Sequence, residues 1–335
     1  MANTILELFE KNHQLLEWRD KVSLLSRQLV MGFSGSSKAV AMASALSNQV
    51  PKIFIVTSTQ NEAEQLVGDL SAILGEDKVY SFFADDVSAA EFIFASPEKT
   101  HSRLESLNFL MDEEASGVLV TSLVGTKLHL PNPRVYKDSR IDLVLGKEHD
   151  LDALSRHLTH IGYQRVEQVL SPGEFSRRGD ILDIYELTAE LPYRLEFFGD
   201  EIDRIVEFDV LTGEVKRSLN FVAIFPASHY VVPQEQIERA IKGIKEELAE
   251  QVTYFKEHDQ LIEAQRIAER TNFDIEMLRE TGFCSGIENY SRHLAGLEPG
   301  QPPSTLIDFF GDDFLMIIDE SHITVPQIGG MYAGS

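Results

Sequence analysis

The sequence predicts an α/β fold in which a parallel-sheet domain is interrupted by an inserted α+β domain. Residues 1–140 alternate between helical and strand patterns, which is typical of a parallel sheet covered by helices on both faces. Residues 141–227 change to short segments with period-two alternation between glycine turns, which indicates an antiparallel sheet. Residues 228–335 begin with long helical patterns and end on an apolar strand-like run. We expect this run to return to the first sheet, so that the parallel-sheet domain is discontinuous.

The first part of the parallel-sheet domain is expected within residues 1–140. Apolar and β-branched runs favour strands, whereas runs of small or helix-forming residues favour helices. On this basis the expected strands are Gln28–Met31, Lys52–Thr57 and Val118–Thr121, and the expected helices are Ala39–Leu46 and Glu62–Leu74.

The inserted domain is expected within residues 141–227. Asp180–Tyr185 and Tyr193–Phe198 alternate apolar with polar residues, and glycines separate such segments. The segment Asp150–His160 has a helical pattern, and we expect it to pack as one helix on the antiparallel sheet.

The last stretch, residues 228–335, is expected to supply two helices and the final strand of the discontinuous domain. Apolar residues recur there at spacings of three and four, which we interpret as a core-packing stripe rather than a partner-binding face. The stripe consists of Ile237, Ile241, Ile244, Leu248, Val252 and Phe255, and a second helix is expected over Gln260–Arg279. The strand Leu315–Ile318 is expected to lie beside Gln28–Met31 and to be buried on both faces. This pairing would bring Asp319 near Lys38.

Length, charge and cysteine content limit the class of protein. With 335 residues, of which 43% are hydrophobic and 25% charged, the chain is expected to form two or three globular domains. A formal net charge of −24 counts against broad DNA affinity, because DNA binding depends on Lys and Arg displacing counterions from phosphates. The only cysteine is Cys284 and the first residues lack a signal-peptide pattern, so we expect a cytosolic protein. No uncharged apolar run approaches the roughly 20 residues that span a bilayer, so no membrane partner is expected.

Residues 32–39 have the outline of a phosphate-binding P-loop, G-x-x-x-x-G-K-S/T, with two positions lost. In that motif glycines let backbone N–H groups wrap the phosphates, the lysine meets the β- and γ-phosphates, and the hydroxyl holds Mg²⁺. Gly32 and Lys38 keep their places, whereas Ser37 replaces the second glycine and Ala39 replaces the hydroxyl residue. Because alanine cannot ligate a metal, we interpret this segment as a degenerate P-loop.

A second nucleotide-binding motif follows the last expected strand. Residues 319–322 read Asp-Glu-Ser-His, a DExH box, which is where a P-loop ATPase carries its second metal-organising carboxylate. Without a hydroxyl at position 39 the metal loses an anchor, and no second motor domain is expected to close over ATP, since the sequence stops soon after the box. We therefore expect no ATPase activity, no catalytic residue and no metal site, with ATP and Mg²⁺ bound at most weakly. The degenerate nucleotide site would comprise Gly32, Gly35, Lys38, Asp319 and Glu320.

Two segments carry a resemblance to known families. Residues 173–184 (GEFSRRGDILDI) and 191–202 (LPYRLEFFGDEI) resemble the domain shared by the bacterial repair families UvrB and Mfd. Residues 1 to about 208, including the degenerate P-loop, resemble the amino-terminal region of the Mfd family. From about residue 209 onward the chain is similar to the UvrB family, at residues 225–229, 282–293 and 319–322. The resemblance implies a degenerate helicase-like (RecA-type) scaffold and favours a hybrid of the two families, with a divergent Mfd as the alternative.

In both families the shared domain binds the damage-sensing protein UvrA, and the resemblance implies the same partner here. Arg165, Arg178 and Glu196 match the families' contact residues. The UvrB family has a further arginine where this chain has Ser176, and Arg177 is the candidate to replace it. On a strand, however, Arg177 would point to the opposite face from Ser176.

The residues themselves support a partner-binding role for the arginines but leave a plainer alternative open. Arginines beside glycine turns offer planar donors that suit a protein interface, and in an acidic protein they would complement an acidic partner patch. In the alternative, Arg165 and Arg178 only pair with neighbours such as Glu167 and Asp180.

Contact with DNA is expected to be indirect or weak. The UvrB family uses an aromatic hairpin whose repeated tyrosines can stack on bases. Residues 82–92 here contain no tyrosine and three acids, and we interpret their phenylalanines as core residues. The sequence thus predicts a non-catalytic UvrA-binding module on a degenerate helicase-like scaffold. The alternative function is an ATP-dependent DNA repair enzyme fragment of the UvrB type.

Overall fold

The chain folds into two compact units. The structure is a computed structural model, and it describes residues 13–22, 27–47, 49–84, 97–228, 232, 234–282, 284, 286–298, 300–311 and 313–332. The first unit consists of Met1–Leu128 and Thr305–Ser335, and the second unit is His129–Ser304. Each unit is described by itself below.

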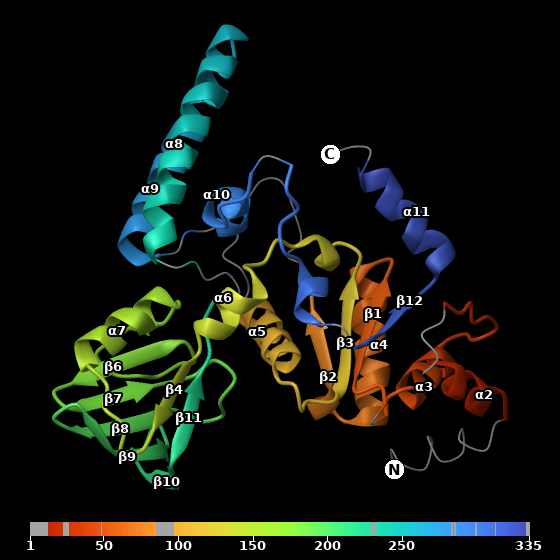
Figure 1. The fold of residues 1–335 in the computed structure, drawn as a ribbon, viewed down its shortest axis with the longest axis horizontal. Coiled ribbons are helices and arrows are strands. Elements are labelled where there is room, and N and C mark those ends of the chain that lie inside the picture. Colours follow the sequence, from red (N-terminus) through yellow and green to blue (C-terminus); the bar gives the residue numbers. More distant parts are fainter. Residues whose placement is uncertain are drawn as a thin grey trace. The chain divides into compact units, whose positions relative to one another are not determined.

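The first unit is built on a four-stranded parallel sheet (Figure 1), with strand order β12-β1-β3-β2. The strands are β1 (Lys52–Thr57), β2 (Val79–Phe82), β3 (Gly117–Ser122) and β12 (Leu315–Ile318). Every residue of the two central strands, β1 and β3, is buried, as a parallel sheet covered by helices requires. The predicted α/β fold with a discontinuous parallel sheet is confirmed.

The helices of the first unit follow from local sequence signals. They are α2 (His13–Val22), α3 (Ser36–Ser44), α4 (Gln60–Leu74), α5 (Pro97–Met111) and α11 (Ser321–Tyr332), with the short 3₁₀ helices η1 (Glu76–Lys78), η2 (Gly125–Lys127) and η4 (Leu306–Phe309). At the start of α4 the Thr59 hydroxyl accepts a hydrogen bond from the Glu62 N–H, and the Glu62 carboxylate accepts one from the Thr59 N–H. Buried residues of α3 and α4, such as Ala39 and Leu66, share one apolar cluster with Ile53 of β1.

Two predictions about the last strand are wrong. Residues 27–34 form no helix or strand, and Leu29 and Met31 are 77% and 80% exposed, so Gln28–Met31 is not the neighbour of β12. β12 instead pairs in parallel with β1, with Leu315 opposite Ile53. Within the described residues β12 is the end strand of its sheet, and Met316 is 41% exposed rather than buried on both faces. An apolar run of four residues favours a strand, but its neighbours are decided by packing that the run itself does not encode.

The second unit contains a six-stranded sheet with the order β10-β9-β8-β7-β6-β5. Its strands are β5 (Gln164–Arg165), β6 (Glu174–Arg178), β7 (Ile181–Ile184), β8 (Tyr193–Phe198), β9 (Glu201–Phe208) and β10 (Val215–Leu219). Neighbouring strands are antiparallel except β5 and β6, which run parallel. The predicted antiparallel sheet, with strands near 180–185 and 193–198, is confirmed.

One face of this sheet forms the apolar core of the second unit. Helix α7 (Leu151–His160) begins after Asp150, whose carboxylate accepts a hydrogen bond of 2.9 Å from the Ala153 N–H. Leu154 and Leu158 of α7 are buried in one cluster with Phe175 and Leu182 of the sheet, so the predicted helix and its packing are confirmed. The unit also holds α6 (Pro133–Asp138) and a two-stranded antiparallel sheet of β4 (Ile141–Val144) and β11 (Phe221–Ile224).

The rest of the second unit is helical. It comprises α8 (Gln234–Glu257), α9 (Leu261–Thr281), η3 (Ile287–Tyr290) and α10 (Ser291–Leu294). In the predicted stripe, Ile237, Ile241 and Ile244 are buried with Leu278 of α9 and Cys284, which confirms the core interpretation for this half of α8. The boundaries of the two compact units along the chain fall at residues 128/129 and 304/305, so these helices belong to the second unit. The domain boundaries that the sequence predicts, at 140/141 and 227/228, stay predictions.

Part of the aromatic segment at 82–92 lies outside the described residues, which stop at 84 and resume at 97. Phe82 is fully buried, and Phe83 is partly buried against the apolar cluster of the first unit, as expected for core residues. His229, Phe283 and Ser285, from the UvrB-like blocks, also lie outside the described residues. None of the helices that the structure describes is long and apolar enough to cross a membrane.

Candidate partner-binding and nucleotide sites

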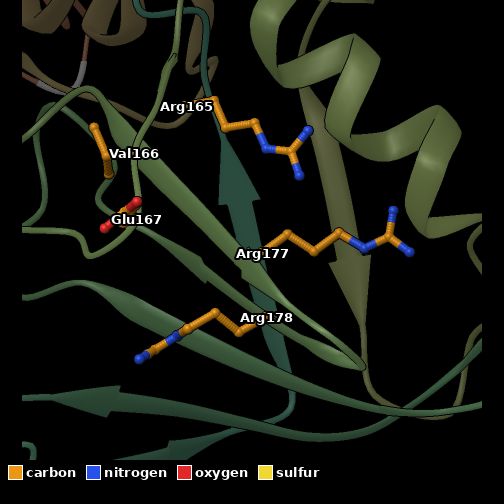
Figure 2. A pocket seen from close by; sticks show the side chains of 5 residues that line it. All are labelled: Arg165, Val166, Glu167, Arg177 and Arg178. Atoms are coloured by element: carbon orange, nitrogen blue, oxygen red, sulfur yellow. The ribbon is translucent and has the colours of Figure 1, made fainter.

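Three of the four predicted partner-binding residues meet at one edge of the six-stranded sheet. Among the strands that the structure describes β5 is the end strand of this sheet, and Arg165 on it lies opposite Phe175 of β6. A pocket of about 590 Å³ at this edge is lined by Arg165, Val166, Glu167, Arg177 and Arg178 (Figure 2). The fourth residue, Glu196, does not line it.

The neighbouring arginines of β6 point to opposite faces of the sheet. Figure 2 shows Arg165 and Arg177 extending to one side and Arg178 to the other. The Arg177 guanidinium forms an ion pair with Asp152 in the first turn of α7, on the core side of the sheet. Ser176 is buried on the other side, and its hydroxyl donates a hydrogen bond of 2.7 Å to the Glu167 carbonyl. The prediction that Arg177 and Ser176 point to opposite faces is confirmed.

Arg165 presents its guanidinium at the sheet edge. Its side chain is exposed, and its guanidinium forms no hydrogen bond or ion pair with any residue that the structure describes. The alternative in which Arg165 pairs with Glu167 is therefore wrong for this structure. An exposed guanidinium without an internal partner keeps all of its N–H donors for another molecule.

Arg178 does pair, but with Asp183 rather than with Asp180. Arg178 lies opposite Ile181 in the ladder, and Asp183 is two positions along β7, so both side chains are on the same face. The Arg178 Nη2 atom donates to Asp183 Oδ2 at 2.9 Å, while the Arg178 side chain stays 54% exposed. Asp180 stands in the turn before β7 and forms no ion pair within the described part of the chain.

The same face carries further charged residues that the sequence did not single out. Arg194 of β8 binds Asp183 through two hydrogen bonds, Nε–Oδ1 at 2.6 Å and Nη2–Oδ2 at 2.8 Å, and these bonds raise the pKa of Arg194. Glu196, on the same strand, binds Arg204 of β9 at 3.1 Å, and both of these side chains are exposed. In the sequence, Asp183 stands two residues after Ile181, and Arg194 two residues before Glu196, so period-two alternation places each pair on one face of its strand. Which residues of neighbouring strands bind one another could be known only from the strand register.

The degenerate P-loop lies at the start of α3. The loop is held by its own side chain: the Ser37 hydroxyl donates to the Ser34 carbonyl at 2.7 Å and accepts from the Ser34 N–H at 3.1 Å. Gly32 and Gly35 have φ angles of 98° and 54°, a conformation that favours glycine. Ala39, at the position of the lost hydroxyl, is fully buried in the core of the first unit.

Lys38 and Asp319 are brought together, as predicted. Asp319 follows β12, and its N–H donates to the Val56 carbonyl of β1 at 2.8 Å. Its buried carboxylate accepts a hydrogen bond of 2.5 Å from the Lys38 ammonium. Glu320 is exposed, with a φ angle of 46°, and its carboxylate lies 3.4 Å from His322.

These residues do not fit a nucleotide–Mg²⁺ site. The lysine that would meet phosphate is bound to the carboxylate that would organise the metal, and Ala39 supplies no oxygen. Among the residues that the structure describes, no group of three or more His, Cys, Asp or Glu side chains could hold a metal ion.

Comparison with known proteins shows that the chain is similar in sequence to UvrB proteins. Residues 141–230 match the UvrB interaction domain and residues 235–296 match the UvrB third helical domain. The chain is 47% identical over 319 residues to UvrABC system protein B of Agathobacter rectalis, covering 92% of this chain and 48% of the relative. It is 41% identical over 322 residues to the protein of the same name from Carboxydothermus hydrogenoformans, covering 92% and 49%. The chain therefore carries two UvrB-type domains and spans about half the length of the curated relatives it matches.

The UvrB similarity also bears on the expected hybrid. An alignment of 319 residues extends far beyond residues 209–335, so the front part of the chain is also similar to UvrB. The Mfd-like front and the hybrid origin receive no support from these relatives.

Proposed function

We propose that this chain is a UvrB-type component of bacterial nucleotide excision repair whose inserted domain binds UvrA. The observation that carries the proposal is the exposed guanidinium of Arg165, which has no partner among the described residues and lines one pocket with Arg177 and Arg178, within the match to the UvrB interaction domain. The proposed contact set is Arg165, Arg177, Arg178 and Glu196.

Charge and geometry support an acidic partner patch. The chain has a formal net charge of −24, so the exposed arginines Arg165 and Arg178 at one sheet edge are a local exception on an acidic protein. Arginine presents a rigid fork of donors that binds carboxylates in pairs, and arginines are enriched among the residues that dominate interface energies. Arg177 is the weakest member of the proposed set, since Asp152 already binds it.

We propose further that the nucleotide site is not catalytic. Turnover of ATP requires the P-loop lysine on the phosphates and a metal between hydroxyl and carboxylate ligands. Here the lysine is bound to Asp319, and Ala39 stands at the hydroxyl position. Any binding of ATP must first break the Lys38–Asp319 pair, so we expect it to be weak.

The second candidate is an ATP-dependent DNA repair enzyme fragment of the UvrB type. It is favoured by the convergence of Lys38 and Asp319 at the end of the parallel sheet, where P-loop proteins hold nucleotide. Steady ATP hydrolysis by the unmodified chain, lost in Glu320→Gln, would favour this candidate over the non-catalytic one.

Titration of the purified chain with UvrA tests the first proposal. Arg178→Glu should weaken binding by at least about 2 kcal/mol if Arg178 is a buried interface residue, which is roughly thirtyfold in Kd. Arg266→Glu makes the same charge change on the exposed surface of α9 and is the matched control. Equal affinities of wild type and Arg178→Glu would remove Arg178 from the interface, and no binding by the wild type would end the proposal.

Four finer points stay part of the proposal. Residues 141–227 act as the UvrA-binding domain, inserted between 1–140 and 228–335. DNA is bound at most weakly, because the acidic chain repels phosphates. The protein is proposed to work in the cytoplasm. Descent of residues 1 to about 208 from Mfd stays a hypothesis, which a residue-by-residue comparison of that segment with both families would decide.

A further inference from the structure

A buried carboxylate stands behind the exposed arginine of the proposed interface. Asp183 is only 2% exposed, and both of its oxygens accept hydrogen bonds from arginines. Oδ1 binds Arg194 Nε at 2.6 Å, and Oδ2 binds both Arg194 Nη2 at 2.8 Å and Arg178 Nη2 at 2.9 Å. Arg194 is held in turn by Phe208, whose ring centroid lies 4.3 Å from the guanidinium carbon. The four residues form a chain of contacts across strands β6, β7, β8 and β9.

The charges of this group favour an outward-facing cation. Two guanidinium groups and one carboxylate leave one net positive charge on the trio. Arg194 is mostly covered and binds Asp183 through two bonds, so the carboxylate is compensated without Arg178. Arg178 makes a single bond to Asp183 and is 54% exposed, so most of its donors and the excess charge face outward. A lone Arg178–Asp183 pair would instead have cancelled the charge.

We infer that Asp183 is a positioning residue, which holds the Arg178 guanidinium in a fixed orientation ready for an anionic patch on the partner. An exposed arginine with free rotation loses side-chain entropy when it binds. The bond to Asp183 restricts Arg178 before the partner arrives, which lowers that loss. The inference rests on the proposed UvrA-binding function, but its first consequence is a property of the free chain.

Arginine side-chain dynamics in the free chain are the first test. In ¹⁵N relaxation measurements on the Nε–Hε groups, Arg178 should be more restricted than the exposed Arg266 of α9. Asp183→Asn should make Arg178 as mobile as Arg266, while Asp180→Asn, a matched loss of one carboxylate in the adjacent turn, should change nothing. Equal mobility of Arg178 and Arg266 in the unmodified chain would overturn the inference whether or not UvrA binds.

Binding to UvrA is the second test, combined with removal of the arginine. Asp183→Asn should raise Kd about two- to tenfold, the range expected from immobilising one long side chain. In an Arg178→Ala background the same change should have no further effect, because no guanidinium remains to be positioned. A loss of the same size in both backgrounds would mean that Asp183 acts on the fold alone and would refute the positioning role. If wild type does not bind UvrA, the proposed function fails, and the relaxation test alone decides the inference.

A second variant covers the case in which Asp183→Asn does not fold. Asp183→Leu combined with Arg194→Met replaces the covered pair by apolar side chains of similar length, a change that buried ion pairs often tolerate. Arg178 then keeps its exposure but loses its anchor, so the same gain in mobility and the same loss of affinity are expected. A folded double variant with a restricted Arg178 and wild-type affinity would contradict the inference.

Discussion

Replacing Gly243 by alanine should destabilise the helical part of the second unit, although the same change stabilises most helices. Gly243 lies in the middle of α8, where it has no positive φ angle that would require glycine. A Cβ atom at this position would lie 2.6 Å from His293 Nδ1 and 3.1 Å from His293 Cε1. The imidazole cannot easily turn aside, because its Nε2 atom lies 2.5 Å from a carboxylate oxygen of Glu247, one turn further along α8.

The magnitude follows from two opposing terms. Alanine in place of glycine inside a helix gains roughly 0.5–1 kcal/mol from the lower entropy of the unfolded chain. Forcing a methyl group into a filled space costs typically about 1–3 kcal/mol. The contact of 2.6 Å is far inside van der Waals separation, so the second term should prevail. We expect a net loss of about 1–2 kcal/mol in the free energy of unfolding.

Urea unfolding, followed together with hydrogen exchange of the α8 amides, measures the effect. Gly68→Ala is the matched control, because Gly68 lies inside α4, is exposed and has open space around its Cα, and it should gain stability. Adding His293→Ala should relieve the clash, so the two changes should be strongly non-additive. Stabilisation by Gly243→Ala alone, or strict additivity with His293→Ala, would refute the reasoning.

Three further predictions concern the ion pairs and the P-loop. Lys38→Met should lower the free energy of unfolding of the first unit by about 1 kcal/mol, because it leaves the buried carboxylate of Asp319 without its ammonium partner. Urea unfolding measures this, and unchanged stability would mean that the ion pair contributes nothing. Glu247 has a pKa below its ordinary value of 4.5, first through its hydrogen bond with His293, so its contribution is present above that pH and is lost as the pH falls below it. Between pH 6 and about 3, the free energy of unfolding should fall less in Glu247→Gln than in wild type. Parallel plots of unfolding free energy against pH for the two proteins would contradict this. Restoring the P-loop by Ser37→Gly together with Ala39→Thr should raise the nucleotide affinity measured by calorimetry but leave ATP turnover low, because Lys38 must still leave Asp319. Rapid ATP turnover by this double variant would contradict the proposal that the site is not catalytic.

Local sequence patterns were sufficient to predict those helices and strands that depend mainly on neighbouring residues in the chain. Local helical patterns predict helices over 62–74 and 150–160, and the structure contains them as α4 and α7, because helix propensity and i, i+4 contacts involve neighbours in the chain. Period-two alternation likewise predicted β8 at Tyr193–Phe198, because it depends only on which side chains face the core. Lys38 and Asp319 also meet as predicted, although the strand pairing from which we expected this, between Leu315–Ile318 and Gln28–Met31, does not form.

Other features were decided only by tertiary structure. The partner of Arg178 is Asp183 rather than Asp180 because strand register, not distance in sequence, sets which side chains share a face. Among the described strands β12 is an end strand beside β1, while Leu29, Val30 and Met31 are exposed, because strand neighbours depend on the packing of the whole sheet. The space at Gly243 is filled by a side chain fifty positions later in the chain, which no local pattern specifies. Periodicity encodes which face of an element is buried, whereas the atoms that meet that face come from distant segments and are fixed by close packing.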